Sequence, residues 1–212
     1  MPRRSRAPEG VLPVAFFRRD AETVARDLLG RYLIRTTAGG VCAVARIVET
    51  EAYLGATDRA SHAFDGRRTK RTETMYRAGG CAYVYLIYGM HHCLNVVTGP
   101  SGEANAVLLR AIAPVEGIEW MRTNRSLGEP VRPGAIGGGP GKLCQALAID
   151  RSFDGISLLG GRLRCAVGEP VDEAQVARGP RIGVDYAGEA AAWPLRFGVA
   201  GHEEMSRPRL GR

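Results

Sequence analysis

The chain has 212 residues, of which 45% are hydrophobic and 24% are charged, a composition typical of one compact globular domain. Lys and Arg outnumber Asp and Glu by 29 to 22, and the net charge of +7 favours a polyanionic partner such as nucleic acid. No stretch approaches about 20 continuous apolar residues, so we expect no membrane helix and no membrane partner.

The five cysteines are odd in number and irregularly spaced, which argues against a disulfide framework and indicates a reduced, intracellular protein. The run His91-His92-Cys93 is a poor metal site, because adjacent strand residues point to opposite faces. The run His202-Glu203-Glu204 lacks the second histidine of a zinc helix. We therefore expect neither a metal ion nor a cofactor.

The expected elements follow one another along the chain as an irregular mixture of helices and strands. Residues 1–19 form a basic, flexible N-terminus, and Asp20 can cap a helix that runs to about Leu29. Long sheet segments with irregularly inserted helices indicate an α+β fold. The remaining expected elements are a hairpin of strands 32–37 and 41–50, helices 58–64 and 70–77, strands 82–87, 93–98 and 106–113, helices 115–125 and 142–148, and strands 162–167, 181–185 and 195–199.

The strand that ends with residues 47–53 (IVETEAY) carries two carboxylates and a tyrosine. Alternation along a strand places Glu49, Glu51 and Tyr53 on one face, and we expect them to be exposed at the strand tip. Two interpretations are open from this segment. The face is either an active site or a solvated strand edge whose charges block unwanted pairing.

The strand-like segment 82–95 carries three tyrosines, at positions 83, 85 and 88. Buried tyrosine hydroxyls need hydrogen-bond partners, so tyrosines clustered near a turn indicate a surface that faces a ligand or a groove. Ordinary strand packing is the alternative, and it is the preferred interpretation for Tyr83. Together with the acidic strand, the cluster indicates a carboxylate that acts beside stacked planar groups.

The loop 137–142 (GGGPGK) enters a predicted helix. It is not a P-loop, because Ile136 stands where the first glycine is required and Leu143 stands where Ser or Thr should hold magnesium. Exposed backbone N–H groups at such a point favour a phosphate, and a single nucleic-acid phosphate would suffice. A tight turn that packs closely is the alternative.

Five segments of the sequence act together as a set of motifs: Val48–Gly55 with His62 following, Tyr83–Met90 leading to Asn95, Val107–Arg110, Gly139–Ile149 and Pro194–Phe197. In this order they resemble the signature blocks of the alkyladenine (3-methyladenine) DNA glycosylases. The likeness covers roughly residues 23–201, and implies a single glycosylase domain over 20–201 followed by a basic C-terminal tail at 202–212. It implies an α+β fold with a curved, mainly antiparallel sheet and surrounding helices, like the C-terminal domain of formyltransferases.

The resemblance implies a monofunctional enzyme that flips alkylated or deaminated purines of the 3-methyladenine class out of duplex DNA. The enzyme would hydrolyse the N-glycosidic bond and leave an abasic site, in base excision repair. Glu51 would be the general base that activates the water, with Arg110 helping to fix it. The expected partner is duplex DNA with damaged purines. The expected state is a monomer, in the cytoplasm and nucleoid of a bacterium or the nucleus of a eukaryote.

The resemblance also assigns the residues that hold the base. Tyr53 and Tyr85 match the rings that sandwich the flipped base, which suits alkylated purines whose ring carries a positive charge. His62 contacts the base from the side. Asn95 crowds the exocyclic amine of guanine, and Glu49 has a structural role.

The remaining assignments concern DNA. Tyr88, in the turn 88–90, matches the residue that fills the hole left by the flipped nucleotide. Gly141 and Lys142 would contact phosphates. Two other functions stay open: a catalytically silent DNA-binding protein, and an RNA-directed or formyltransferase-like relative of the fold that uses the same sheet to hold single strands. Activity on a duplex with one alkylated base separates the three.

Overall fold

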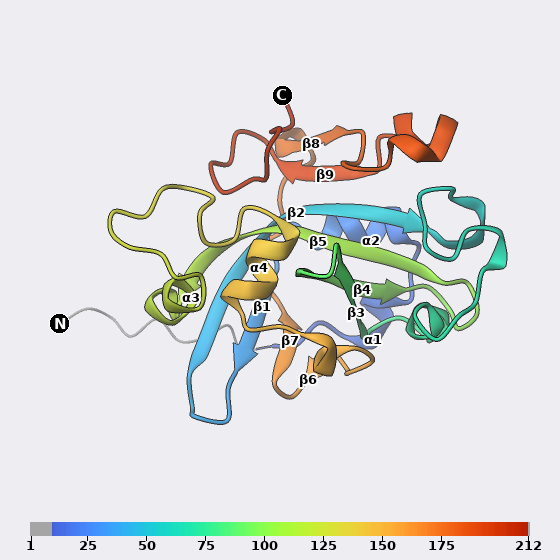
Figure 1. Ribbon diagram of the computed structural model, residues 1–212. Coiled ribbons are helices and arrows are strands. Elements are labelled where there is room, and N and C mark those ends of the chain that lie inside the picture. Colours follow the sequence, from blue (N-terminus) through green and yellow to red (C-terminus); the bar gives the residue numbers. More distant parts are fainter. Residues whose placement is uncertain (1–9, 212) are drawn as a thin grey trace.

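The computed structural model describes residues 10–211 (Figure 1). Part of the predicted flexible N-terminus, residues 1–9, lies outside the described residues. The helices are α1 (Val14–Phe17), α2 (Ala21–Asp27), α3 (Ile118–Asn124) and α4 (Pro140–Ala146). The strands are β1 (Tyr32–Thr36), β2 (Cys42–Leu54), β3 (Ala82–Ile87), β4 (His91–Thr98), β5 (Asn105–Glu116), β6 (Leu159–Gly160), β7 (Leu163–Ala166), β8 (Val176–Gly179) and β9 (Arg196–Val199).

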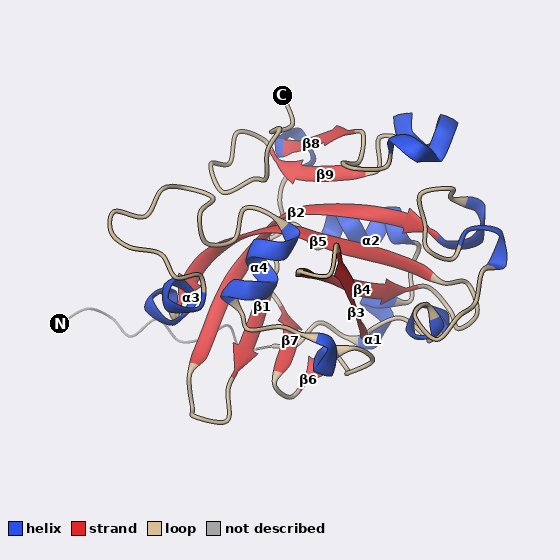
Figure 2. Cartoon of the chain, in the orientation of Figure 1, coloured by secondary structure: helices blue, strands red, loops and turns tan. Residues whose placement is uncertain are grey.

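One antiparallel sheet forms the frame of the molecule. Its strands follow the order β3-β4-β5-β2-β1-β7-β6, and β9 joins it by pairing with β2 and β8. The strands curve around α4, while α2 lies on the other side of β2 and β5 (Figure 2). The predicted α+β fold, a single domain with a curved antiparallel sheet and surrounding helices, is confirmed.

Strand β2 lies inside the sheet and has neighbours along both edges. One edge pairs with β5, and the other edge pairs with β1 through residues 42–46 and with β9 through residues 49–51. Glu49 and Glu51 consequently have no exposed surface. The expectation that these carboxylates are exposed at a strand tip is therefore wrong, and so is the interpretation of a solvated strand edge.

The core fills both sides of the sheet with apolar side chains. Its largest cluster joins Val24 of α2 and Leu28, which follows this helix, to Leu109 of β5 and to Leu143 of α4. Gly117 separates β5 from α3, and its φ of +70° belongs to the left-handed region. A Cβ at this position would lie 2.9 Å from the backbone of Ala43, so the turn requires glycine.

Two predicted α-helices are absent from the described residues. Segments 58–64 and 70–77 instead contain short 3₁₀ helices, Phe64–Gly66 and Glu73–Tyr76. The Asp58 side chain accepts hydrogen bonds from the N–H groups of Leu54 and Ala60, which holds a turn rather than a helix start. Short segments also gain too few hydrogen bonds to offset the cost of helix nucleation. Further 3₁₀ helices are Gly55–Thr57, Arg151–Phe153, Glu173–Gln175 and Asp185–Ala192.

The predicted strand 181–185 is also wrong, because this segment is irregular and passes into the 3₁₀ helix Asp185–Ala192. Its backbone and side-chain donors contact side chains of the site instead of a neighbouring strand. The other predicted strands and the helices near residues 20, 118 and 142 are confirmed within a few residues at their ends.

Both ends of the described chain pack against the domain. At the N-terminal end, Leu12 and Phe17 are buried in the core. At the C-terminal end, Met205 and Ser206 are 2% and 3% exposed, in a segment that the sequence predicts to be a tail. No helix within residues 10–211 is long and apolar enough to cross a membrane.

Candidate active site

A pocket of about 210 Å³ opens between β3, β4, β5 and the segment 182–186. We call it the aromatic pocket, because tyrosines and a histidine supply much of its wall. Six of the residues predicted for the site line this one cavity, although they come from distant parts of the chain. They are Tyr53, His62, Tyr85, Tyr88, Asn95 and Arg110.

Glu51 lies behind the wall of the aromatic pocket and contacts it through three residues. Its Oε2 accepts a hydrogen bond from the Tyr53 hydroxyl at 2.8 Å. Its Oε1 accepts the backbone N–H of Ile182 at 2.8 Å and lies 3.2 Å from a guanidinium nitrogen of Arg110. All three partners line the pocket, so the carboxylate is held at the point where a bound group would meet them.

Arg110 links the two buried carboxylates of β2. Its Nε donates to Glu49 at 3.2 Å, while another nitrogen lies 3.2 Å from Glu51. Burial alone lowers the pKa of Arg110, but the charges of Glu51 and Glu49 outweigh burial and raise the pKa above its usual value. Arg110 is thus a permanent cation beside Glu51, and both carboxylates face it as strand alternation predicted.

Glu49 belongs to a buried network behind Arg110. It accepts a hydrogen bond from Arg196 at 2.6 Å. It also accepts the backbone N–H of Ser206 at 2.6 Å and the Ser206 hydroxyl at 2.9 Å. Every oxygen of Glu49 is therefore occupied by fixed donors, which agrees with a structural role.

The ring of Tyr53 has a cation on one side. The Arg181 guanidinium lies 4.8 Å from the ring centroid and donates to Asp58 at 2.8 Å. Both members of this ion pair are fully buried. Burial, and next the charge of Glu51, raise the pKa of Tyr53 well above its usual value, so the hydroxyl stays protonated and donates to Glu51.

His62 is fixed by two tyrosines on the opposite wall. Its Nδ1 lies 2.9 Å from the Tyr83 hydroxyl, and its ring meets the Tyr85 ring edge-on at 4.6 Å. Burial, followed by the charges of Arg71 and Arg67, lowers the pKa of His62 to about 4. His62 is thus neutral near pH 7 and can donate or accept a hydrogen bond at Nε2.

Asn95 and Tyr88 occupy contrasting positions. Asn95 is buried, and its amide nitrogen donates to the Tyr83 carbonyl at 3.1 Å, so its orientation is fixed. Tyr88 is 83% exposed in the turn between β3 and β4, next to Met90, which is 71% exposed. The left-handed φ of +53° at Tyr88 forms part of this turn, and the two side chains give the molecule a projecting apolar tip.

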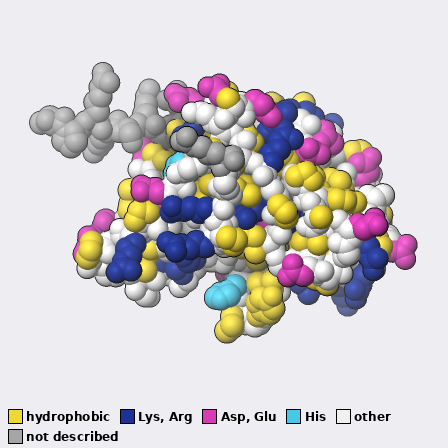
Figure 3. Space-filling view, turned by 90° about the horizontal axis from the view of Figure 1, so that it is seen from above, with side chains coloured by type: hydrophobic (Ala, Val, Ile, Leu, Met, Phe, Trp, Pro, Cys, Tyr) yellow, Lys and Arg dark blue, Asp and Glu magenta, His cyan; other side chains and the backbone are white. Residues whose placement is uncertain are grey.

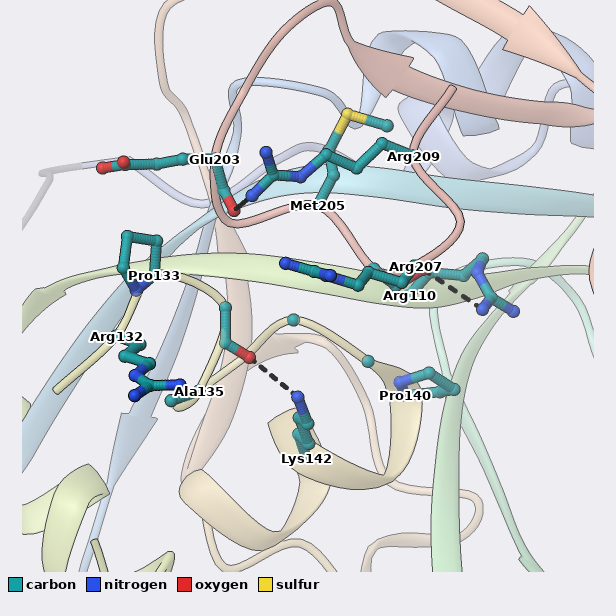
Figure 4. A pocket seen from close by; sticks show the side chains of 14 residues that line it. Arg110, Arg132, Pro133, Ala135, Pro140, Lys142, Glu203, Met205, Arg207 and Arg209 are labelled. Carbon is teal, nitrogen blue, oxygen red and sulfur yellow. Dashed lines mark hydrogen bonds between the residues drawn. The ribbon is translucent and has the colours of Figure 1, made fainter. Parts of the chain in front are cut away.

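Gly141 and Lys142 lie outside the aromatic pocket, at the start of α4. Gly141 packs against His91, because a Cβ there would lie 3.1 Å from the His91 Cβ. Lys142 donates to the Gly134 carbonyl at 3.0 Å and lines a second cavity of about 480 Å³ (Figure 4). We call this cavity the cationic groove; Arg110, Arg132, Lys142, Arg207 and Arg209 are its basic lining residues.

Known proteins resemble this chain over nearly its whole length. The model of the methylpurine-DNA glycosylase family matches residues 15–203. The chain belongs to this family. A relative from Myxococcus xanthus (strain DK1622), named "Putative 3-methyladenine DNA glycosylase", is 48% identical over 95% of this chain and 96% of its own. A relative of the same name from Anaeromyxobacter dehalogenans (strain 2CP-1) is 50% identical over 94% of this chain and 87% of its own. Another, from Desulfitobacterium hafniense (strain Y51), is 46% identical over 86% of this chain and 91% of its own.

The protein is accordingly a DNA glycosylase, an enzyme of DNA repair that belongs to the response to alkylation damage. Three residues of this glycosylase site were missed by sequence reasoning: Ile182, Arg181 and Ser206. Ile182 contacts Glu51 through its backbone, which leaves no trace in side-chain patterns. Arg181 lies in a segment that the sequence predicts as a strand, and Ser206 lies in the predicted C-terminal tail, so neither residue was expected at the site. In residues 10–211 of the glycosylase, no three His, Cys, Asp or Glu side chains are grouped so that they could hold a metal ion.

Proposed function

We propose that this glycosylase flips an alkylated or deaminated purine of the 3-methyladenine class out of duplex DNA into the aromatic pocket and hydrolyses its N-glycosidic bond. The observation that best supports this proposal is that Glu51 contacts three groups that all line the pocket: the Tyr53 hydroxyl, the Ile182 amide and Arg110. A carboxylate fixed beside stacked rings is what activation of a water next to a bound base requires.

The contacts of Glu51 leave room for a water. A carboxylate has about four lone-pair positions. The described part of the chain occupies at most three of them, and Oε2 is bonded only to Tyr53. In the proposal a water binds at Oε2, Glu51 takes its proton as the oxygen attacks the sugar carbon, and the negative charge of Glu51 stabilises the oxocarbenium-like transition state.

The other residues bind and select the base. Tyr53 and Tyr85 stack on the purine, and their electron-rich faces favour a base that carries a positive charge. His62 and Asn95 contact its edges, and Tyr88 enters the duplex in place of the flipped nucleotide. The sequence contains two lysines, Lys70 and Lys142, and neither lines the aromatic pocket. This supports water, rather than a lysine amine, as the nucleophile that attacks the sugar carbon.

The test is incubation with duplexes that carry one 7-methylguanine, hypoxanthine or ethenoadenine, in the presence of a chelator. We expect abasic sites, detected as strand breaks only after heating in alkali. Failure on every duplex would refute the proposal. Strand breaks before alkali treatment would show a lyase activity and refute the monofunctional mechanism.

A further inference from the structure

We propose that the cationic groove binds the sugar–phosphate backbone of the DNA strand beside the flipped nucleotide, through Arg132, Arg207 and Arg209. The inference rests on the proposed function, because it places the groove next to the base that the aromatic pocket receives. It gives the C-terminal segment 203–209 a direct part in substrate binding.

Two separate segments build the walls of the groove (Figure 4). Arg132 and Lys142 come from the loop 132–139 and the start of α4, while Arg207 and Arg209 come from the C-terminal segment on the opposite side. Glu203 is the carboxylate among the lining residues. The excess of positive charge on both walls suits an extended chain of phosphates that runs between them.

The groove adjoins the aromatic pocket. Arg110 and Pro140 line both cavities, so the two cavities share part of a wall. A nucleotide that is flipped into the aromatic pocket remains attached to its strand. Its neighbouring phosphates therefore lie within a short distance of the pocket, on which the groove borders.

The arginines of the groove are available for a ligand. Among the described residues, the side chains of Arg132 and Arg207 have no hydrogen-bond or ion-pair partner in the protein, and Arg209 donates only to the Glu203 carbonyl. Several guanidinium groups elsewhere on the surface are paired with carboxylates, as Arg178 is with Glu173 at 2.7 Å. Unpaired guanidinium groups keep their full fork of donors, which matches the geometry of phosphate oxygens.

The face of the molecule on the side of the C-terminal segment agrees with this partner. Figure 3 views this face, where Lys and Arg side chains form several groups and Asp and Glu side chains lie mostly near the margin. A polymer of phosphates can contact such groups together, which a single small anion cannot do. We therefore assign the groove to a DNA strand rather than to a free phosphate ion.

The experiment compares two triple variants that remove the same amount of positive charge. R132A/R207A/R209A removes the groove arginines, whereas R18A/R162A/R164A removes three arginines that line neither the groove nor the aromatic pocket. Binding to undamaged duplex is measured against salt concentration, and excision is measured under single-turnover conditions over a range of enzyme concentrations. Thermal unfolding checks that both variants fold.

We expect the groove variant to need at least about tenfold more enzyme for half-maximal excision, with little change in the rate constant at saturation. Its slope of log K against log salt should fall by roughly 0.9 for each phosphate that the variant no longer neutralises, while the control changes little. Equal weakening of both variants would show a general effect of charge and overturn the inference. So would a groove variant that binds like the wild type.

A second measurement locates the phosphates. Neutral methylphosphonates replace single phosphates on either side of the lesion, and both the wild type and the groove variant are tested. We expect one or two replacements to weaken binding by the wild type but not by the groove variant, since the variant has no arginine at these phosphates to be affected. If every methylphosphonate weakened binding by the groove variant as much as binding by the wild type, the two changes would be additive and the assignment would be overturned. If the wild type excises no base, the proposed function fails, while the salt slopes on undamaged DNA still decide whether the groove binds a strand.

Discussion

The backbone N–H of Ile182 donates a 2.8 Å hydrogen bond to Oε1 of Glu51, although 131 residues separate the two along the chain. The bond brings the irregular segment before the 3₁₀ helix Asp185–Ala192 against the middle of the sheet. It holds the carboxylate in place, because the partly buried N–H requires an acceptor and Oε1 of Glu51 supplies it. Together with Tyr53 and Arg110 it leaves Glu51 little freedom to rotate.

Glu51→Gln should lower the single-turnover rate of excision by about two orders of magnitude or more, because it removes the general base and the negative charge. DNA binding should remain close to that of the wild type, since the shape of the side chain is kept. The matched control is Glu119→Gln, which removes a charge from the exposed face of α3. A Glu51→Gln enzyme that excises at nearly the wild-type rate would disprove the role of this residue.

Tyr88→Ala should impair flipping more than bond cleavage, because the exposed Tyr88 side chain lies at the turn and not against Glu51. The reduction in excision rate should be larger for a well-paired lesion than for the same lesion in a mismatch, where unpairing costs less. Rates on both duplexes, for wild type and variant, give the comparison. Equal reductions on the two duplexes would assign Tyr88 to the pocket wall and transfer the wedge to the neighbouring Met90 or His91.

Arg181→Met should lower the free energy of unfolding by about 3–5 kcal/mol, because it leaves the carboxylate of Asp58 buried without its cation. Both side chains of the pair are fully buried. Arg178→Met is the control: this arginine pairs with Glu173 on the surface, where such pairs contribute about 1 kcal/mol or less. Urea unfolding measures the free energy of unfolding of both variants. If this free energy fell by less than about 1 kcal/mol in Arg181→Met, the importance of the buried pair would be contradicted.

Acid should destabilise the protein through His62. Its pKa is about 4 in the folded state, against an ordinary value of 6.5, so between these values the unfolded chain binds the extra proton. Stability therefore decreases as the pH falls below about 6.5, by about 2 kcal/mol at pH 5 relative to pH 7.5. Urea unfolding of the wild type and of His62→Gln at both pH values isolates this contribution. An identical pH dependence of the two proteins would show that His62 is freely protonated in the folded state.

Local patterns were sufficient for much of the fold. The strand-like run of residues 82–87 predicted β3, and the turn at Tyr88, Gly89 and Met90 lies where the sequence placed it. The periods of strands and helices reflect the local geometry of the backbone, so they can be read without knowledge of distant residues. Strand alternation placed Glu49 and Glu51 on one face, and both contact Arg110.

The predictions that failed concern segments whose structure depends on distant partners. Thr57 and Asp58 look like the start of a helix, but Asp58 is held by Arg181, which lies 123 residues further along the chain. The apolar residues of 181–185 predicted a strand, yet Ile182 uses its N–H on Glu51. In both cases a buried charge decided the local backbone, because leaving it without a partner costs more than the local preference contributes.

The amino-acid sequence alone was enough to identify the family, the α+β class and the candidate residues of the aromatic pocket. Three features became visible only in the folded chain: the burial of Glu49 and Glu51, the contact of Ser206 with Glu49 across 157 residues, and the C-terminal wall of the cationic groove. The difference follows from the range of the forces involved. The periodicity of a helix or strand depends only on residues that are neighbours in the chain. A buried carboxylate, in contrast, needs hydrogen-bond donors, and these come from whichever segment folding brings beside it.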